Sequence, residues 1–204
     1  MLFLKDFIYE TSSESPAPGG GSISAYCGSM GIALGTMVAN LSAHKRGWDD
    51  KWEEFSRWAE KGILLQEKLL NLVDKDTEAF NKIIEAFRLP KNSEDEVFNR
   101  KKAIQSATKN AITTPYTIME TAFDSMEIMK VMVEIGNPNS ITDAAVGALC
   151  ARTAILGAFL NVKINCGDYN DKIFVQEIIK KGDELVKKSS KLEKEILDLT
   201  NSKI

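Results

Sequence analysis

The sequence predicts an all-α protein, built as an elongated multi-helix bundle. Apolar residues recur at helical spacing over most of the 204 residues. No run of β-branched residues alternates cleanly between turn signals, as a strand would require. The composition, 44% hydrophobic and 27% charged, is that of a globular protein and argues against disorder. The length suits one domain, and no change in composition divides residues 1–204.

The predicted helices follow one another with short connections. A first helix is expected at 2–10, and the Ser-, Pro- and Gly-rich segment 11–21 forms a loop. Apolar periodicity then predicts helices at 22–45 and 48–88. Ser93 and Glu96 form a capping box that opens a further helix at 94. Pro115 should kink or restart that helix, because proline cannot donate to the helical ladder.

The segment 135–139, Ile-Gly-Asn-Pro-Asn, is a clear stop. Two more helices are expected after it, at 141–166 and 169–200. The helix at 48–88 would be roughly 60 Å long, whereas a compact domain of this size has a radius of gyration of about 17 Å. Either the helix breaks near Gly62 or the bundle is elongated, and elongated bundles often complete their cores as two-fold dimers.

Two helices are unusually rich in small residues. Gly28, Gly31 and Gly35 lie in the helix at 22–45, and Gly147 and Gly157 in the helix at 141–166. Each interior glycine costs a helix about 1 kcal/mol relative to alanine, so some contact should offset it. Close helix–helix packing and the floor of a site for a flat ligand are compatible interpretations.

Bulk properties exclude several classes of function. The net charge of −3 gives no basic surface for nucleic acid. The apolar start of the chain is interrupted by Lys5 and Asp6, unlike a signal peptide. The uncharged stretch 23–41 approaches a membrane-spanning length, but its Gly, Ser and Ala content favours a buried helix. Three separated cysteines without a C-x-x-C pair indicate neither disulfides nor zinc, and predict a cytoplasmic location: Cys27, Cys150 and Cys166.

The most distinctive segment is Pro16–Ser22, with glycines at 19, 20 and 21. Glycine permits close backbone approach, and Ser22 is placed to cap the following helix. The N–H groups of such a terminus favour an anion. The segment is not a Walker A loop, because no Lys-Ser/Thr pair follows the glycines. An ordinary flexible loop with a cap remains the alternative.

Two acidic residues are candidates for proton transfer. Asp143 opens a helix, where the dipole stabilises a carboxylate, although a first-turn acid needs no further role. Asp76 lies in the acidic segment 74–78, which is either a solvated face or a carboxylate with a raised pKa. The single histidine, His44, lacks the partners of a catalytic base, and no cluster of metal-ligating residues is present.

Several of these segments together resemble the formiminotetrahydrofolate cyclodeaminase and methenyltetrahydrofolate cyclohydrolase family. The family signature reads P-x-P-G-G-G-S and then M-V-A-N-L-T. This chain departs from it at Ser42, where threonine is usual, and at Thr142, where serine more often precedes the aspartate. The matching segments occur in the same order over nearly the whole chain: Pro16–Ser22, Met37–Ser42, Asp76–Phe80, Leu89–Lys91, Arg100, Ala103–Gln105, Asp143 and Asn161–Asn165.

The resemblance implies an all-α homodimer that acts on a tetrahydrofolate one-carbon adduct without a metal or a tightly bound cofactor. It implies proton-transfer roles for Asp143 and Asp76. We favour the cyclodeaminase reaction, which forms 5,10-methenyltetrahydrofolate and ammonia from 5-formiminotetrahydrofolate. Cyclohydrolysis of 5,10-methenyl- to 10-formyltetrahydrofolate and a non-catalytic folate-binding dimer are the alternatives. The substrate-binding residues it implies, for the pterin and the glutamate tail, are Gly19, Gly20, Gly21, Ser22, Asn40, Lys45, Lys91, Arg100 and Gln105.

Overall fold

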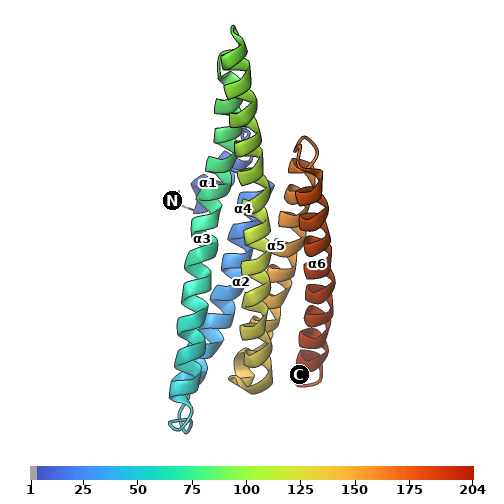
Figure 1. The fold of residues 1–204 in the computed structure, drawn as a ribbon. Coiled ribbons are helices and arrows are strands. Elements are labelled where there is room, and N and C mark those ends of the chain that lie inside the picture. Colours follow the sequence, from blue (N-terminus) through green and yellow to red (C-terminus); the bar gives the residue numbers. More distant parts are fainter. Residues whose placement is uncertain (1–3) are drawn as a thin grey trace.

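The computed structural model describes residues 4–204, and all regular secondary structure in this part of the chain is helical, with no strand (Figure 1). The all-α prediction is confirmed, while part of the first predicted helix, residues 2 and 3, lies outside the described residues. The elements are α1 (Leu4–Thr11), α2 (Gly20–Ala43), α3 (Trp52–Arg88), α4 (Glu94–Ile135), the 3₁₀ turn η1 (Pro138–Ser140), α5 (Ile141–Asn165) and α6 (Lys172–Asn201).

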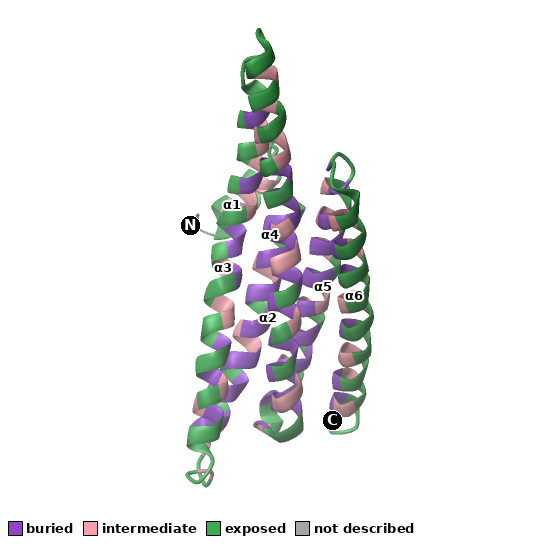
Figure 2. Ribbon diagram, viewed as in Figure 1, coloured by how far each residue is buried: buried purple, intermediate pink, exposed green. Residues whose placement is uncertain are grey.

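Helix α2 is the centre of the bundle. It packs against α3, α4 and α5, and α6 lies against α4 and α5. The hairpin of α3 and α4 extends beyond the other helices at the top of Figure 1. Buried residues gather on the inner faces of the long helices (Figure 2), and the core is made mainly of aliphatic and methionine side chains, among them Ile32, Ile118, Met129 and Ile155.

The predicted elongation is confirmed, and the alternative of a break near Gly62 is wrong. Helix α3 runs for 37 residues without interruption, which is about 55 Å. Gly62 instead marks a close approach of two helices, because a Cβ at this position would meet the hydroxyl of Thr36 on α2.

Helix α4 likewise does not restart at Pro115 and continues over 42 residues. Proline lacks the N–H that would bond the carbonyl of Ala111 one turn earlier. That carbonyl instead accepts a hydrogen bond from Asn165 Nδ2 on α5, at 2.7 Å. A side chain from a neighbouring helix therefore replaces the missing rung of the ladder.

The predicted caps are partly correct. Ser93 accepts from the backbone N–H of Glu96 at 3.2 Å, as in a capping box, but the Glu96 carboxylate accepts from Asn92 rather than from Ser93. The prediction that Ser22 caps α2 is wrong. The helix begins at Gly20 with Gly19 as its N-cap, and no side chain bonds the cap. Ser22 lies inside the first turn, so its hydroxyl is available for another partner.

The small residues of α2 and α5 form a close helix–helix seam. A Cβ at Gly31 would lie 2.7 Å from the carbonyl oxygen of Gly147, and a Cβ at Gly147 would lie 2.7 Å from that of Gly31. The structure therefore confirms the packing interpretation. By length and composition, α2 and the segment Pro138–Asn165 could each span a membrane, but 61% and 50% of their most apolar windows are buried within the bundle.

Candidate functional site

A cleft of about 280 Å³ lies where the N-terminus of α2 meets α3, α4 and α5. The loop before α2 contributes backbone, α3 contributes one carboxylate, and α5 contributes two amides. The remaining walls are apolar, and they combine the small side chains of Ala79 and Ala111 with larger ones such as Phe80. The lining residues are Pro16, Ala17, Gly19, Gly20, Asp76, Ala79, Phe80, Ile83, Ala111, Asn161, Ile164 and Asn165.

Asp76 is the charged group of the cleft that can exchange protons. Its Oδ2 accepts a hydrogen bond from Ser22 Oγ at 3.0 Å, and Ser22 Oγ also lies 3.2 Å from Thr77 Oγ1. Burial raises the pKa of the Asp76 carboxyl above its ordinary value, while hydrogen bonds from the side chain and backbone of Ser22 oppose the shift. A half-buried carboxyl with a raised pKa is suited to accept a proton and return it.

Asn161 and Asn165 were not among the predicted site residues. Both lie on α5 four residues apart, so they share one face of the helix. Asn161 Nδ2 donates to the carbonyl of Gly157 at 2.9 Å, and Asn165 Nδ2 donates to that of Ala111. These bonds fix the amides and leave each Oδ1 as an acceptor for a ligand. The spacing of the two asparagines was the signal in the sequence that could have assigned them to the site.

We expect Asn165→Ala to lower the free energy of unfolding by about 1–3 kcal/mol, because it leaves the Ala111 carbonyl without a partner. In a Pro115→Ala background residue 115 regains an N–H that can reach this carbonyl. The cost of Asn165→Ala should then largely disappear. Urea unfolding of the four proteins of this double-mutant cycle measures the coupling, and equal costs in the two backgrounds would contradict the account.

A second prediction concerns Gly21, whose added Cβ would collide with the carboxylate of Asp76. Gly21→Ala should displace this carboxylate and lower kcat by one to two orders of magnitude, since catalytic groups misplaced by about 1 Å can cost that much. The matched control is Gly35→Ala, farther along the same helix and away from the cleft, because a Cβ there meets neighbours only at 3.6 Å or more. Equal kcat for the two variants, measured with the assay described below, would show that the position of Asp76 does not matter.

The structure divides the predicted site residues into separate groups. Gly19, Gly20, Gly21, Ser22 and Asp76 meet in the cleft. A second group lies towards the far ends of α2 and α5, where Ser42 Oγ accepts from the backbone N–H of Asn137 at 2.8 Å. Its members are Asn40, Lys45 and Asp143. Asp143 is 18 residues from Asn161 along α5, roughly 27 Å, so it cannot reach the cleft of its own chain.

The third group lies along the hairpin of α3 and α4. Lys91 is in the turn, and both Nε and Nη2 of Arg100 donate to the carbonyl of Phe87, at 3.3 and 3.1 Å. Gln105 donates to the carbonyl of Asp168 and accepts from the N–H of Asn170. Arg100 and Gln105 thus hold turns of the chain in this structure, and their contacts with a substrate stay a prediction.

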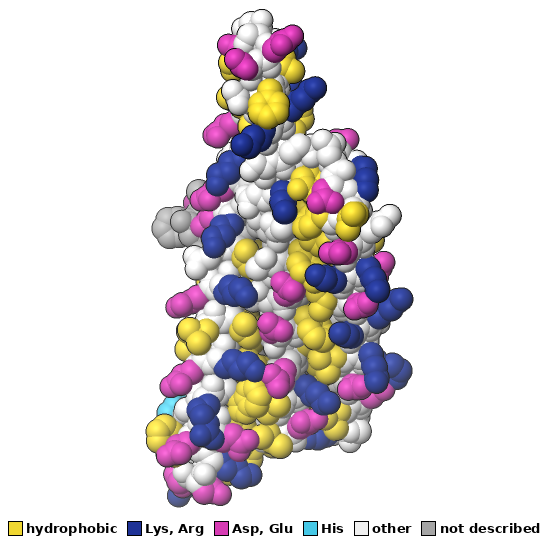
Figure 3. Space-filling model, in the orientation of Figure 1, with side chains coloured by type: hydrophobic (Ala, Val, Ile, Leu, Met, Phe, Trp, Pro, Cys, Tyr) yellow, Lys and Arg dark blue, Asp and Glu magenta, His cyan; other side chains and the backbone are white. Residues whose placement is uncertain are grey.

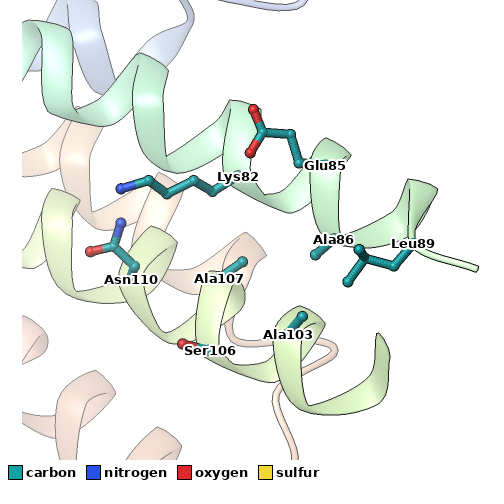
Figure 4. Close-up of a pocket in the computed structure, with 8 residues that line it drawn as sticks. All are labelled: Lys82, Glu85, Ala86, Leu89, Ala103, Ser106, Ala107 and Asn110. Atoms are coloured by element: carbon teal, nitrogen blue, oxygen red, sulfur yellow. The ribbon is translucent and has the colours of Figure 1, made fainter. Parts of the chain in front are cut away.

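A shallower groove of about 570 Å³ runs between α3 and α4 near their tip (Figure 4). Its floor is made of small side chains such as Ala103 and Ala107, and Lys82 and Asn110 lie at one end of it. On α3 the groove is lined by Lys82 and Glu85, whereas the cleft is lined by Phe80 and Ile83. Because residues three or four apart share a helix face, the two depressions lie on different sides of α3.

Within residues 4–204, no three His, Cys, Asp or Glu side chains gather as a metal site would require. The fold and the cleft define a class of protein. It is an all-α bundle with a cleft that can hold a flat, partly polar molecule between apolar side chains and amides, beside one carboxyl. The chain belongs to the formiminotransferase-cyclodeaminase family, whose model matches residues 3–184.

Known relatives include a protein of similar length and longer proteins. Methenyltetrahydrofolate cyclohydrolase of Methylorubrum extorquens is 31% identical over 201 residues, covering 98% of this chain and 97% of its own. Formimidoyltransferase-cyclodeaminase of Mus musculus is 32% identical over 85% of this chain, which spans only 32% of the mouse protein. The crystal structure of formiminotetrahydrofolate cyclodeaminase from Thermotoga maritima matches with a TM-score of 0.82 and 28% identity, covering 97% of this chain and 96% of that one. The resemblance to this folate-processing enzyme family is therefore confirmed.

Proposed function

We propose that the chain is a formiminotetrahydrofolate cyclodeaminase, with Asp76 as its proton-transfer group. The observation that carries the proposal is the position of this carboxyl inside the cleft, where it accepts a hydrogen bond from Ser22 Oγ, in a member of this family. In the reaction N10 of 5-formiminotetrahydrofolate attacks the formimino carbon and gives a tetrahedral carbon between N5 and N10. Ammonia then leaves and 5,10-methenyltetrahydrofolate forms.

One carboxyl can serve both steps of this reaction, the attack of N10 and the departure of ammonia. The formimino group reacts in its protonated form, so its nitrogen becomes an NH2 group when N10 attacks. N10 must then lose its proton, and the NH2 group must gain one to leave as ammonia. Asp76 can accept the first proton as a carboxylate and deliver it as a carboxylic acid, because its raised pKa brings the two forms closer in free energy near neutral pH. The Ser22 hydroxyl donates to Oδ2 and so orients the carboxylate.

The walls of the cleft suit a pterin. The side chain of Phe80 and the backbone of Gly19 and Gly20 offer flat surfaces, as a planar ring requires. The pterin edge carries N–H donors, and the carboxamide oxygens of Asn161 and Asn165 are acceptors fixed at the same cleft. A volume of about 280 Å³ is that of a small site, so we place the pterin and the bridging carbon inside and the glutamate tail outside.

Cyclohydrolysis is the second candidate, and the full-length similarity to the Methylorubrum protein favours it. Water would attack the methenyl carbon, and Asp76 would take one proton from that water. The same proton would pass to N5 as the ring opens to 10-formyltetrahydrofolate, and the hydroxyl proton would go to solvent as the formyl carbonyl forms. The proton-transfer group, Asp76, and the tetrahedral carbon between N5 and N10 are the same in both reactions.

The test is absorbance at the methenyl band with purified protein. Increasing absorbance with release of one ammonia from 5-formiminotetrahydrofolate is the expected result. Enzyme-dependent decay of 5,10-methenyltetrahydrofolate without the first activity would establish the cyclohydrolase instead. A folded protein that binds either folate and turns over neither would be a binding protein, and the proposal would be wrong.

A further inference from the structure

Thr77 makes an unusual hydrogen bond for a threonine inside a helix. Helical threonines often donate to the carbonyl of the residue four positions earlier, as Thr36 and Thr200 do in this protein at 2.8 and 2.7 Å. The Oγ1 atom of Thr77, on α3, instead lies 3.2 Å from Ser22 Oγ in the first turn of α2. In the described part of the chain it forms no bond to a carbonyl of its own helix. The Thr77 hydroxyl is therefore directed at the residue that bonds Asp76.

The direction of these hydrogen bonds follows from the number of hydrogens available. An ionised carboxylate only accepts, so in the 3.0 Å contact between Ser22 Oγ and Asp76 Oδ2 the serine must be the donor. A serine hydroxyl has one hydrogen, and once that hydrogen is donated its oxygen can only accept. Thr77 must therefore donate to Ser22. The three side chains form a hydrogen-bond chain that runs from Thr77 through Ser22 to Asp76.

Donation from Thr77 strengthens the bond that reaches Asp76, for two reasons. A hydroxyl whose oxygen accepts a hydrogen bond becomes a better donor, because the bonds of a chain polarise one another. The same contact also holds the Ser22 hydroxyl away from its own helix. Ser24, two residues farther along α2, turns its hydroxyl back to the carbonyl four positions earlier, at 2.6 Å. Without Thr77, the Ser22 hydroxyl has the same alternative, and Asp76 loses a donor.

Neighbouring charges do not take the place of this chain in setting the state of Asp76. Lys, Arg, Asp and Glu are interspersed over the side of the molecule shown in Figure 3, but Asp76 is the one charged residue among those that line the cleft. Burial and the hydrogen bonds from Ser22 are what shift its pKa, in opposite directions. The nearest titratable residues along the surrounding elements are exposed or contact other groups: Glu14 before α2, Tyr26 and Cys27 on α2, Asp74, Lys75, Glu78 and Lys82 on α3, Lys109 on α4 and Lys163 on α5.

We propose that Thr77 is a positioning residue for proton transfer by Asp76, because its hydroxyl fixes the hydrogen of Ser22 on the carboxylate. In the first step the N10–H bond breaks and an O–H bond forms on Asp76. In the second step this O–H bond breaks and the proton goes to the departing NH2 group. Hydrogen bonds to a carboxylate stabilise its ionised form, so the chain makes protonated Asp76 a stronger acid for the second step. The inference rests on the proposed function and adds a residue that acts through Ser22 and Asp76.

Thr77→Val tests the chain, because valine keeps the shape of the side chain and removes the hydroxyl. Loss of hydrogen bonding to the carboxylate raises the pKa of Asp76, so the acidic limb of the profile of kcat/KM against pH should move to higher pH. Well below the midpoint of this limb kcat/KM should fall about threefold, while the plateau at higher pH stays within about twofold of wild type. Thr77→Ser keeps a hydroxyl and should restore the profile. The matched control is Thr117→Val, whose hydroxyl donates to its own helix at 3.0 Å, and its profile should be that of the wild type.

A double-mutant cycle with Ser22→Ala separates this role from a structural one. Ser22→Ala already breaks the chain, so Thr77→Val in that background should shift the acidic limb no further. A side chain that only packs would lower the Tm or the plateau and leave the limb at the wild-type pH. An unmoved limb in Thr77→Val, or a shift of equal size with and without Ser22, would overturn the proposal.

A second measurement needs no turnover. The carboxyl carbon of Asp76 is followed by NMR over a pH titration of labelled protein, with Asp76→Asn to assign the signal. The pKa of this carboxyl should be higher in Thr77→Val than in the wild type and in Thr77→Ser. Equal pKa values in the three proteins would refute the role of Thr77, whatever the protein catalyses. A shift in the expected direction, in a protein that converts neither folate, would establish the hydrogen-bond chain and refute only the proposed function.

Discussion

Asp76→Asn should lower kcat by a factor of 10² to 10⁴ with little change in KM, because asparagine keeps the shape of the side chain but cannot exchange a proton. The amide can still accept a hydrogen bond from Ser22 Oγ, so the cleft should keep its geometry. Asp74→Asn is the matched control, since Asp74 is exposed on the same helix two residues away. Initial rates with 5-formiminotetrahydrofolate measure the effect, and a kcat within threefold of wild type would remove Asp76 from the mechanism.

The same variant makes a prediction about stability. Burial raises the pKa of Asp76 above the ordinary value of 3.8 that the carboxyl has in the unfolded chain. Below pH 3.8 the carboxyl is protonated in both the folded and the unfolded state, so its burial does not lower the free energy of unfolding. Stability is lost as the pH rises through the pKa of the folded state. Asp76→Asn should therefore match or exceed the wild-type Tm at pH 7, with no gain below pH 3.8. A lower Tm at pH 7 would mean that the carboxylate stabilises the fold.

Much of the fold was predictable because it depends on local patterns. Periodicity and turn residues placed the six helices to within a few residues, since apolar spacing and helix stops act locally. The errors came from contacts distant in sequence. No local rule shows that the Ala111 carbonyl freed by Pro115 is bonded by Asn165 from another helix. Gly62 similarly looks like a helix breaker until Thr36 is seen against it.

The site was predictable in part for the same reason. Gly19, Gly20 and Ser22 follow from one short motif, and Asp76 follows from another, but only the packing of α2 on α3 brings them together. The distance between Asp143 and Asp76 could not be predicted from the sequence, because residue spacing gives positions along one helix and not distances between helices. The outward-facing apolar side chains of α2 and α5 could be assigned only once the structure showed which face of each helix is buried.

The seam between α2 and α5 should tolerate no added methyl group at its centre. Gly31→Ala would place a Cβ 2.7 Å from the Gly147 carbonyl oxygen and 2.9 Å from Cys150 Cβ. A backbone carbonyl cannot move aside as a flexible side chain can, so the helices must separate. We expect a loss of about 2 kcal/mol in the free energy of unfolding, which is an overpacking cost of up to ~3 less the ~1 gained from the helix propensity of alanine.

Gly35→Ala on the same helix is the matched control, because its Cβ would meet neighbours only at 3.6 Å or more, and it should be neutral or stabilising. Gly147→Ala should cost about as much as Gly31→Ala, and the double variant less than their sum, since both act on one gap. Urea midpoints measure these differences. The cleft lies at one end of this seam, where Gly20 approaches Asn161. Separation of the helices in Gly31→Ala should therefore also lower kcat. A Gly31→Ala variant with wild-type stability and activity would show that the close approach of the helices is needed for neither property.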